Sequence, residues 1–416
     1  MLSSAYRAQC EAEEARHTPD RDAGNRRLAL LALALGTFAI GTGEFGSNGI
    51  IQLFAADLDI SLPQATYAVT AYAVGVMIGS PVITIMAARA NRKKLLLALI
   101  LLFLAGNLLS ALSANFGMLL AARFVTGTVQ GAYFGAGAVV AAYVYGPGKG
   151  GRAFATVMAG LTIATIVGSP LGTFVGQQAG WQALYVVVTA IGLLAGAAIL
   201  FWVPSTTALD GGPIAQELGA LRRPMVWVIM VVAALGISSI FAVYTFIGPY
   251  ITDAARAGES LIPVALAVFG VGMAVGNQAG GRLADRYAHR GLVLGYGSVL
   301  LFLVAIATAG EMTWLLMPAL FGVGATMMLA IPTIQVLLTT YAPEAPTLMG
   351  ALNLASLNLA NALGAVGGSI TLAAGLGTLS TAWAGLVLTV AGLLVFAVTV
   401  PRVAPPRPVQ ATAAAA

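Results

Sequence analysis

Long uninterrupted runs of apolar residues alternate with short polar segments along most of the chain. A hydrocarbon core about 30 Å thick needs roughly 20 apolar residues per helix. Twelve runs meet this length, near residues 28–54, 63–87, 95–113, 117–145, 153–178, 183–203, 225–251, 260–283, 291–309, 313–341, 346–374 and 379–401. The pattern therefore predicts an all-α membrane protein with twelve transmembrane helices and both termini on the same side.

The longest internal polar break lies at residues 204–224. It divides the predicted spans into two six-helix halves, 28–203 and 225–401. Residues 1–27 alternate acids and bases and lack the short apolar core of a secretory signal, so we expect a disordered tail. Residues 402–416 form a second tail.

The two halves resemble each other at a constant offset of 197 residues, which predicts a six-helix pseudo-repeat. Parallel repeats are typical of transporters whose substrate site lies between the halves; chance matching in a Gly- and Arg-rich chain is the alternative. At this offset Glu44 corresponds to Phe241 and Arg123 to Leu320, so the charged residues belong to the N-terminal half alone. The recurring pairs are Gly75 with Gly272, Gly79 with Gly276, Arg89 with Arg286 and Lys93 with Arg290.

Composition excludes a soluble domain, because 59% of the residues are hydrophobic and 8% are charged, against about 25% charged in soluble domains. The net charge of +5 does not indicate nucleic-acid binding, since the bases lie in short loops between apolar runs. The single cysteine, Cys10, excludes a disulfide framework or a thiol–metal site.

The bases gather on one side of the predicted spans and the acids on the other. This asymmetry places the basic side, and with it both termini, in the cytoplasm. The acids of the opposite side are Asp57, Asp59, Asp253, Glu259 and Glu311, with Arg256 among them.

Glu44 is the one carboxylate in the middle of an apolar run, and Arg123 is the other charged residue within a span. A charge at that depth costs several kcal/mol and usually marks function. At a rise of 1.5 Å per residue, Glu44 lies roughly 24 Å along the first helix and Arg123 roughly 9 Å below the opposite surface, so both fall in the outer half of the membrane.

Burial disfavours an ionised carboxylate, whereas a nearby guanidinium favours it. We therefore hypothesise that Glu44 is a proton-coupling site with Arg123 as its electrostatic partner. The alternative is a static buried acid that is hydrogen-bonded to the backbone or to hydroxyl groups.

Two loops on the basic side carry related motifs. Residues 281–286 read G-R-L-A-D-R, and the loop after the second run reads as a degenerate copy in which Ala88 replaces the aspartate. An acid and a base at a short helix–helix turn can pair and lock the helix ends, so we predict gating by Asp285 with Arg286. Arg89 and Arg92 belong to the degenerate copy, where simple anchoring at the membrane surface is the alternative.

Small residues in the fourth and fifth runs predict close helix packing. The fourth run has an R-x-x-x-G-x-x-x-G motif that begins at Arg123, and its glycines form one smooth helix face. The predicted packing residues are Gly127, Gly131 and Gly135 in the fourth run and Gly168, Pro170 and Gly172 in the fifth.

These motifs resemble those of the major facilitator superfamily. The G-x-L-A-D-R loop, the fourth-run motif and a partial G-P-x-x-G-G motif at 168–173 are similar to those of its twelve-helix drug:proton antiporters. With Glu44-Phe45 and the Asn-rich eleventh run, the chain resembles the sugar-efflux (arabinose efflux permease) and chloramphenicol-resistance branch over residues 28–401. The resemblance implies the major facilitator fold, a cavity lined by the first, fourth, seventh and tenth helices, and the inner (plasma) membrane of a bacterial cell.

Polar residues in spans that this fold turns inward are candidates for substrate contacts. Asparagine in a span is also a common link between helices, which is the alternative for Asn353 and Asn361. The candidates are Asn48, Gln130, Tyr133, Tyr244, Thr245, Gln335, Asn353 and Asn361.

We expect a proton-coupled efflux antiporter of a small sugar or of a drug such as chloramphenicol. Its partners would be the solute, protons and the lipid bilayer, without nucleic acid, metal or cofactor, and the protein would be a monomer. A facilitator or proton-coupled importer on the same fold is the alternative, and a polytopic membrane enzyme or sensor is a remote one. The sequence contains no Walker A, H-E-x-x-H or G-x-S-x-G motif, so we do not expect an enzyme.

Overall fold

The computed structural model describes residues 19–146, 150–205, 209, 217–286, 290–343 and 345–400. Within these ranges the regular elements are helices, and none of the described residues lies in a β-strand. Twelve stretches are long and apolar enough to cross a membrane, which confirms the predicted number of spans. Helices suit this environment because they satisfy their own backbone hydrogen bonds where no water is present.

The N-terminal half contains the first six spans, and short helices α3 (Ile51–Asp57) and α4 (Leu62–Ala65) join the first to the second. The fourth span consists of two helices, α7 and α8, that meet at Val129, and the fifth passes through a π-helical turn, η1. The span helices are α2 (Pro19–Gly49), α5 (Tyr67–Met86), α6 (Arg92–Ala111), α7 (Phe116–Thr128) with α8 (Gln130–Tyr145), α9 (Gly150–Ile163) with η1 (Ala164–Gly168) and α10 (Ser169–Ala179), and α11 (Trp181–Trp202).

The C-terminal half repeats this plan after a 3₁₀ turn, η3 (Glu217–Arg222). Its first span is followed by α13 (Ile247–Pro249), the π-helical turn η4 (Tyr250–Ala254) and the 3₁₀ turn η5 (Glu259–Leu261). The span helices are α12 (Pro224–Tyr244), α14 (Ile262–Arg286), α15 (Arg290–Ala309), α16 (Thr313–Met328) with α17 (Ala330–Tyr341), α18 (Pro346–Ala373) and α19 (Ser380–Thr399).

The first helix begins earlier than the apolar pattern indicates. Helix α2 starts at Pro19, within the segment for which the sequence predicts a disordered tail. Proline suits the first helical position. The helix therefore extends beyond its apolar run.

The internal repeat is present in the helix packing. A Cβ atom on Gly127 of α7 would collide with the carbonyl oxygen of Tyr72 in α5, and a Cβ atom on Gly324 of α16 would lie 2.6 Å from the carbonyl oxygen of Phe269 in α14. Gly324 follows Gly127 by 197 residues, and Phe269 follows Tyr72 by the same number. Equivalent helices of the two halves therefore cross at equivalent glycines.

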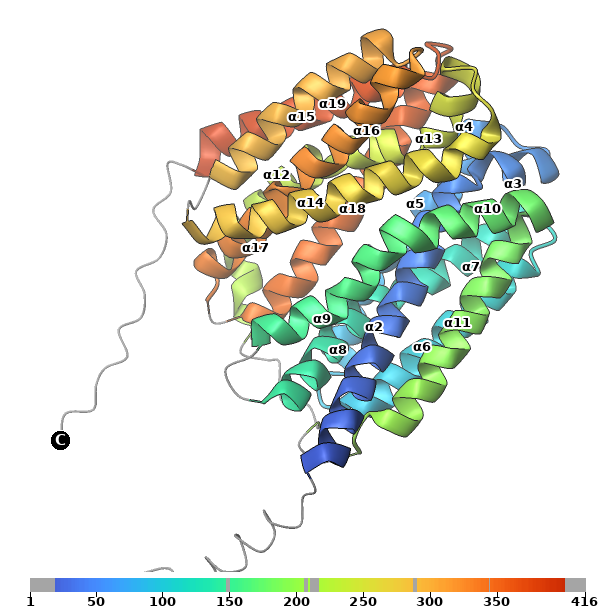
Figure 1. Cartoon of the computed structure of the whole chain (residues 1–416). Coiled ribbons are helices and arrows are strands. Elements are labelled where there is room, and N and C mark those ends of the chain that lie inside the picture. Colours follow the sequence, from blue (N-terminus) through green and yellow to red (C-terminus); the bar gives the residue numbers. More distant parts are fainter. Residues whose placement is uncertain are drawn as a thin grey trace, which may run out of the picture.

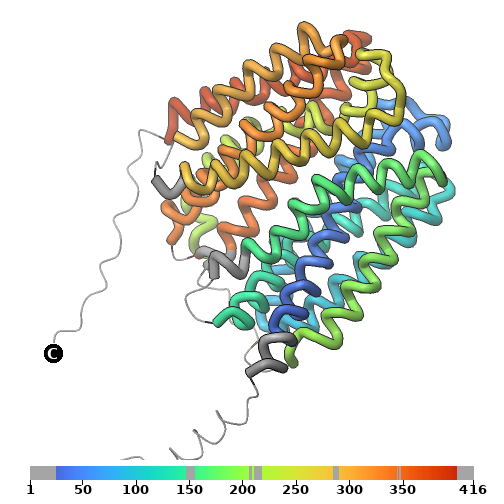
Figure 2. Tube along the Cα trace, viewed as in Figure 1, coloured from blue at the N-terminus to red at the C-terminus, as the bar shows by residue number. Residues whose placement is uncertain are grey.

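The two halves form separate bundles, blue to green and yellow to red in Figure 1. Each bundle has its own hydrophobic core. The bundles meet along two seams, one between α5 and α18 and one between α10 and α14. The trace in Figure 2 shows that α2 begins and α19 finishes at the same end of the molecule, as an even number of spans requires.

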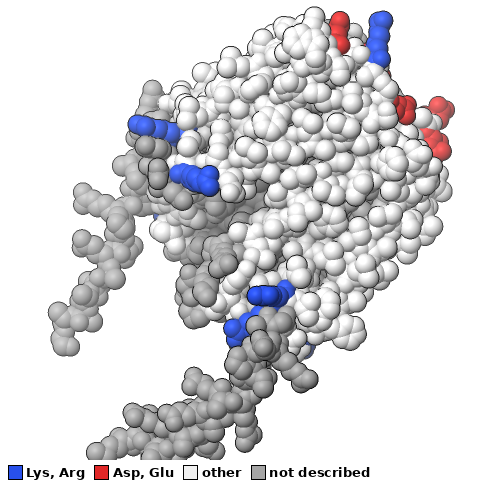
Figure 3. All heavy atoms as spheres, in the orientation of Figure 1, with Lys and Arg blue, Asp and Glu red and all other residues white. Residues whose placement is uncertain are grey.

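Charged side chains lie at the two ends of the molecule and leave a broad uncharged surface between them (Figure 3). We call the two ends the basic end and the acidic end. The uncharged surface carries exposed apolar side chains such as Leu101, Phe201 and Leu301, as expected where lipid is the solvent. The basic end carries Arg26, Arg27, Arg89 and Lys94, and the acidic end carries Asp57, Asp59, Asp253, Glu259 and Arg256.

Candidate functional site

The carboxylate of Glu44 lies inside the N-terminal bundle, with 5% of the residue exposed. Gln130, the first residue of α8 in the fourth span, donates a hydrogen bond from Nε2 to Glu44 Oε2 over 2.8 Å. One turn further along α2, Asn48 donates from Nδ2 to the Glu44 backbone carbonyl over 3.4 Å. The fourth span therefore fixes the position of this buried acid.

The guanidinium of Arg123 lies on α7, with 1% of the residue exposed. Its Cζ atom lies 4.5 Å from the ring centroid of Tyr72 on α5 and 5.5 Å from that of Tyr185 on α11. Such cation–π contacts stabilise a desolvated guanidinium by about 2 kcal/mol. Among the described residues, none accepts a hydrogen bond from Arg123 Nε or Nη1.

Glu44 and Arg123 are close without forming a direct ion pair. The structure describes both side chains, and their charged atoms do not approach within 4.0 Å of each other. Gln130 contacts the acid and two aromatic rings contact the base, so the electrostatic partnership of Glu44 with Arg123 stays a prediction.

The sequence alone does not single out Tyr72 and Tyr185 as partners of Arg123. Their signal is weak, because each is an amphipathic ring within an apolar run and such rings are common. Tyr185 also pairs through its hydroxyl with Ser47 Oγ, 3.1 Å away. That contact links α11 to α2 three residues from the buried acid.

The substrate candidates fall into different environments. The hydroxyl of Tyr133 donates to the Leu33 carbonyl over 3.3 Å, and its ring fills the space that a side chain at Gly36 would occupy. Tyr133 therefore packs α8 against α2. Asn353 Nδ2 donates to Gln335 Oε1 over 2.8 Å and joins α18 to α17, which agrees with the alternative of a link between helices.

Thr245 and Asn361 are buried polar residues of the C-terminal half. Thr245 follows the last residue of α12, and Asn361 lies on α18 with 1% exposed. Within the described part of the chain, Thr245 Oγ1 and Asn361 Oδ1 have no hydrogen-bond partner. These two buried atoms have unused hydrogen-bonding capacity.

Side-chain hydrogen bonds join the two halves toward the acidic end. They come from residues in or next to the two seams and from the segments after the first span of each half. They are Gln52 Nε2 to Thr252 Oγ1 at 3.0 Å, Thr66 Oγ1 with Ser369 Oγ at 2.6 Å, Gln177 Nε2 to the Glu259 carbonyl at 2.9 Å and Ser169 Oγ with the Tyr244 hydroxyl at 2.8 Å.

Of the predicted gating residues, Arg92 is bound within its own half. Its Nη1 and Nη2 atoms donate to the carbonyl oxygens of Ala87 and Ala88, over 3.2 Å and 3.1 Å. A cation is favourable at a helix C-terminus, so Arg92 stabilises the end of α5. Arg89 is exposed at the basic end, and the side chains of Asp285 and Arg286 lie outside the described residues.

The predicted packing face of the fourth span is shorter than the motif indicates. A side chain at Gly131 would collide with Ser80 of α5, but no described atom lies within 4 Å of the position that a Gly135 Cβ would take. Gly135 is also exposed, so the prediction of close packing at Gly135 is wrong. Helix α8 has diverged from α5 at that depth.

In the fifth span, the predicted glycines pack closely within the N-terminal half. Added side chains at Gly168 and Gly172 would meet Thr42 of α2 and Leu184 of α11. Pro170 lies between them and is buried. It faces the seam with α14.

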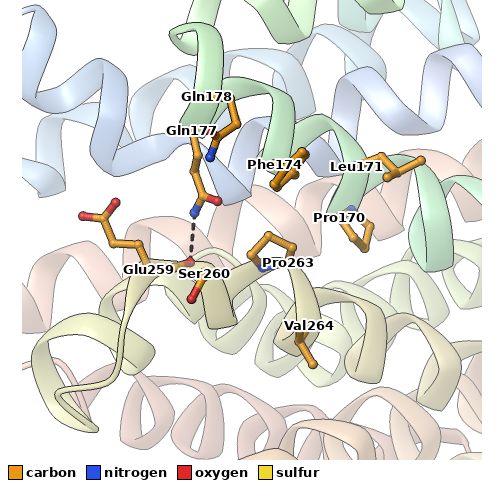
Figure 4. A pocket seen from close by; sticks show the side chains of 9 residues that line it. All are labelled: Pro170, Leu171, Phe174, Gln177, Gln178, Glu259, Ser260, Pro263 and Val264. Atoms are coloured by element: carbon orange, nitrogen blue, oxygen red, sulfur yellow. Dashed lines mark hydrogen bonds between the residues drawn. The ribbon is translucent and has the colours of Figure 1, made fainter.

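A groove of about 450 Å³ lies at this seam, at the acidic end (Figure 4). Leu171, Phe174 and Val264 give it an apolar floor, and Figure 4 shows Gln177 donating across it to the Glu259 carbonyl. Among its described lining residues there is none of the polar substrate candidates. The groove is therefore separate from the buried polar residues around Glu44.

Comparison with known families decides what kind of protein this geometry belongs to. The sequence model of the Major Facilitator Superfamily matches residues 33–365 and 249–416. The chain belongs to the Major Facilitator Superfamily. The assignment from motifs is confirmed.

Relatives of this major facilitator protein are similar over nearly their whole length. The inner membrane transport protein YdhP of Escherichia coli (strain K12) is 35% identical over 349 residues, which cover 84% of this chain and 90% of YdhP. The chloramphenicol resistance protein of Streptomyces lividans is 33% identical over 374 residues, covering 89% and 95%. This protein is a multi-pass transporter of the inner membrane and not an enzyme.

A solved structure shares the fold. It is that of a bacterial homologue of the human lysosomal transporter Spinster, in an inward-facing and unoccupied conformation. The TM-score is 0.66 at 16% identity, over 90% of this chain and 95% of the other. The predicted major facilitator fold is confirmed.

Proposed function

We propose that this major facilitator protein is a proton-coupled exporter, and that Glu44 is the group that carries the proton. The observation that supports this most directly is the burial of Glu44 beside Gln130. Arg123 lies nearby, against aromatic rings, and forms no direct ion pair with the Glu44 carboxylate. An acid at membrane depth with this environment has no evident role in packing.

Two opposing influences act on the proton of Glu44. Burial favours the neutral acid, whereas the charge of Arg123 and the hydrogen bond from Gln130 favour the carboxylate. A small change in hydration or in the distance to Arg123 then changes which form is stable. Movement between two conformations would load the proton in one and release it in the other.

The distribution of charge supports an orientation with the basic end in the cytoplasm. In that orientation the hydrogen bonds between the halves, such as Thr66 with Ser369, lie on the outer side. We infer that this conformation is closed toward the outside, and that export requires these contacts to break.

The solute is best described as small and polar or amphipathic. Arg123 and Glu44 act on each other, so the site offers no spare counter-ion for a strongly charged solute. Thr245 and Asn361 offer neutral hydrogen-bonding atoms instead. A sugar, or a drug related to the one named in the Streptomyces lividans relative, fits these properties.

The decisive experiment replaces Glu44 in purified protein reconstituted into proteoliposomes. Glu44→Gln keeps size and hydrogen bonding but cannot release a proton, so solute accumulation driven by an imposed proton gradient should be abolished while Glu44→Asp retains part of it. Glu311→Gln is a matched control, because Glu311 is exposed. Uphill transport by Glu44→Gln at the wild-type rate would disprove the assignment.

Direction of transport has its own test. In cells that contain a labelled solute, collapse of the proton gradient should raise retention if the protein exports. A facilitator would show no change, and a proton-coupled importer would show less accumulation.

A further inference from the structure

The side chains of Glu44 and its neighbour Phe45, both on α2, pack against different halves of the molecule. The carboxylate binds Gln130 within the N-terminal bundle. The Phe45 side chain, 6% exposed, is part of the hydrophobic core of the C-terminal bundle. Two consecutive residues of α2 thus join the buried acid to the opposite half.

The contact that Phe45 makes there is with Tyr244, the last residue of α12. The two rings are edge to face, with centroids 5.6 Å apart and an interplanar angle of 84°. On its other side the Tyr244 ring packs against Phe269 of α14, with centroids 5.1 Å apart. Aromatic pairs of this geometry are worth about 1 kcal/mol beyond simple burial.

The hydroxyl of Tyr244 reaches back into the N-terminal half. It lies 2.8 Å from Ser169 Oγ on α10 and donates to the Phe45 backbone carbonyl over 3.4 Å. The chain of donors from Ser169 to Tyr244 to the Phe45 carbonyl crosses the interface between the halves. Tyr244 is therefore held between α2 and α10.

Both helices bend directly beyond this contact. Helix α2 stops at Gly49, where Ile50 has φ −109° and ψ 10°, and α12 stops at Tyr244, with Phe246 at φ −109° and ψ 17°. The segments beyond the bends carry Gln52 and Thr252, which join the halves at the acidic end. A displacement of Phe45 and Tyr244 would therefore occur next to the hydrogen bond between Gln52 and Thr252, which closes the acidic end.

The geometry points to Tyr244, through Phe45, as the positioning residue that transmits the charge state of Glu44 to the closure between the halves. This inference rests on the proposed role of Glu44. The charged and titratable groups around Glu44 are Arg123, Tyr72 and Tyr244 itself. Of these, Tyr244 alone belongs to the C-terminal half.

A double-mutant cycle on the full chain tests it. Thr66→Cys with Ser369→Cys, in a Cys10→Ser background, reports closure of the acidic end through the rate of disulfide formation in lipid nanodiscs. The rate of disulfide formation is measured in four proteins: with neither further substitution, with Glu44→Gln alone, with Tyr244→Phe alone, and with both. Tyr244→Phe keeps both ring contacts and removes only the hydroxyl.

With Tyr244 present, Glu44→Gln should change the rate of disulfide formation about 5-fold, because the net free energy of one hydrogen bond corresponds to a factor of about this size. Tyr244→Phe should remove most of this change. Tyr250→Phe is the matched control. It removes a buried hydroxyl that contacts Thr381 within the C-terminal half, so the effect of Glu44→Gln should persist.

An undiminished effect of Glu44→Gln in the Tyr244→Phe background would overturn the role of Tyr244 and leave the proton site standing. Equal loss in Tyr250→Phe would also overturn it, since any buried hydroxyl would then suffice. A Glu44→Gln variant that changes neither closure nor proton-driven transport would overturn the proposed function, and this inference with it.

Discussion

At Arg123, a buried guanidinium is stabilised by two aromatic faces, Tyr72 and Tyr185, without direct contact to a carboxylate. The planar shape of the group is what allows it to lie against both rings. An ammonium group is compact and more strongly hydrated, so it would lose most of this stabilisation.

Arg123→Lys should therefore reduce the initial rate of transport about 10-fold even though the charge is kept, from the loss of about 1–2 kcal/mol. Solute uptake into proteoliposomes measures the rate. Tyr185→Phe keeps the aromatic face and should remain within about 2-fold of wild type. If Arg123→Lys transports normally, charge alone is sufficient at this position.

The sequence predicts Glu44 and Arg123 as site residues because a charge within an apolar run is rare and conspicuous. It does not predict that Tyr72 and Tyr185 lie between Arg123 and the other helices, because helix pairing decides which side chains meet. The same limit explains Tyr133, whose polar group suggests a solute contact but donates to the Leu33 carbonyl of α2.

At the scale of elements, glycines within the spans differ in what an added side chain would meet. Gly127 and Gly324 lie where a methyl group would meet a backbone carbonyl, whereas Gly135 faces open space. Overpacking of this kind costs about 1–3 kcal/mol, and a backbone obstacle cannot rotate away as a side chain can.

Gly127→Ala and Gly324→Ala should each lower the thermal unfolding temperature of the detergent-solubilised protein and reduce its yield. Gly135→Ala is the control and should behave as wild type or gain slightly, because alanine is the better helix former. Unfolding followed by tryptophan fluorescence measures this. Equal behaviour of all three variants would contradict the predicted close approach at Gly127 and Gly324.

Hydrophobic runs of spanning length predict the number and order of the helices. They do not predict the helix breaks at Val129 and Leu329, because the residues on both sides of each break remain apolar. The early start of α2 at Pro19 depends on local signals in a charged segment, which a membrane pattern does not detect.

At the scale of the whole molecule, two separate cores and hydrogen bonds toward the acidic end define one conformation. If transport requires the acidic end to open, a covalent link there must stop it. Thr66 and Ser369 have their hydroxyl oxygens 2.6 Å apart, within the reach of a disulfide between cysteines at the same positions.

Thr66→Cys with Ser369→Cys, in the Cys10→Ser background, should transport normally when reduced, lose at least about 10-fold in rate when oxidised, and recover on reduction. Each single cysteine variant serves as a control and should not respond to oxidant. Normal transport by the oxidised double variant would mean that this seam does not open during the cycle.

The offset of 197 residues relates two copies of one helical plan, and the buried charged residues are not shared between the copies. The ionisable machinery around Glu44 and Arg123 occupies the first copy, while neutral groups such as Thr245 and Asn361 occupy the second. A chimaera that receives residues 225–400 from a relative with a different cargo should adopt that cargo and keep its own dependence on the ion gradient. Exchange of the first copy should change the dependence on the ion gradient and leave the cargo unchanged. Competition between the two cargoes for transport into vesicles would show which copy determines cargo selectivity.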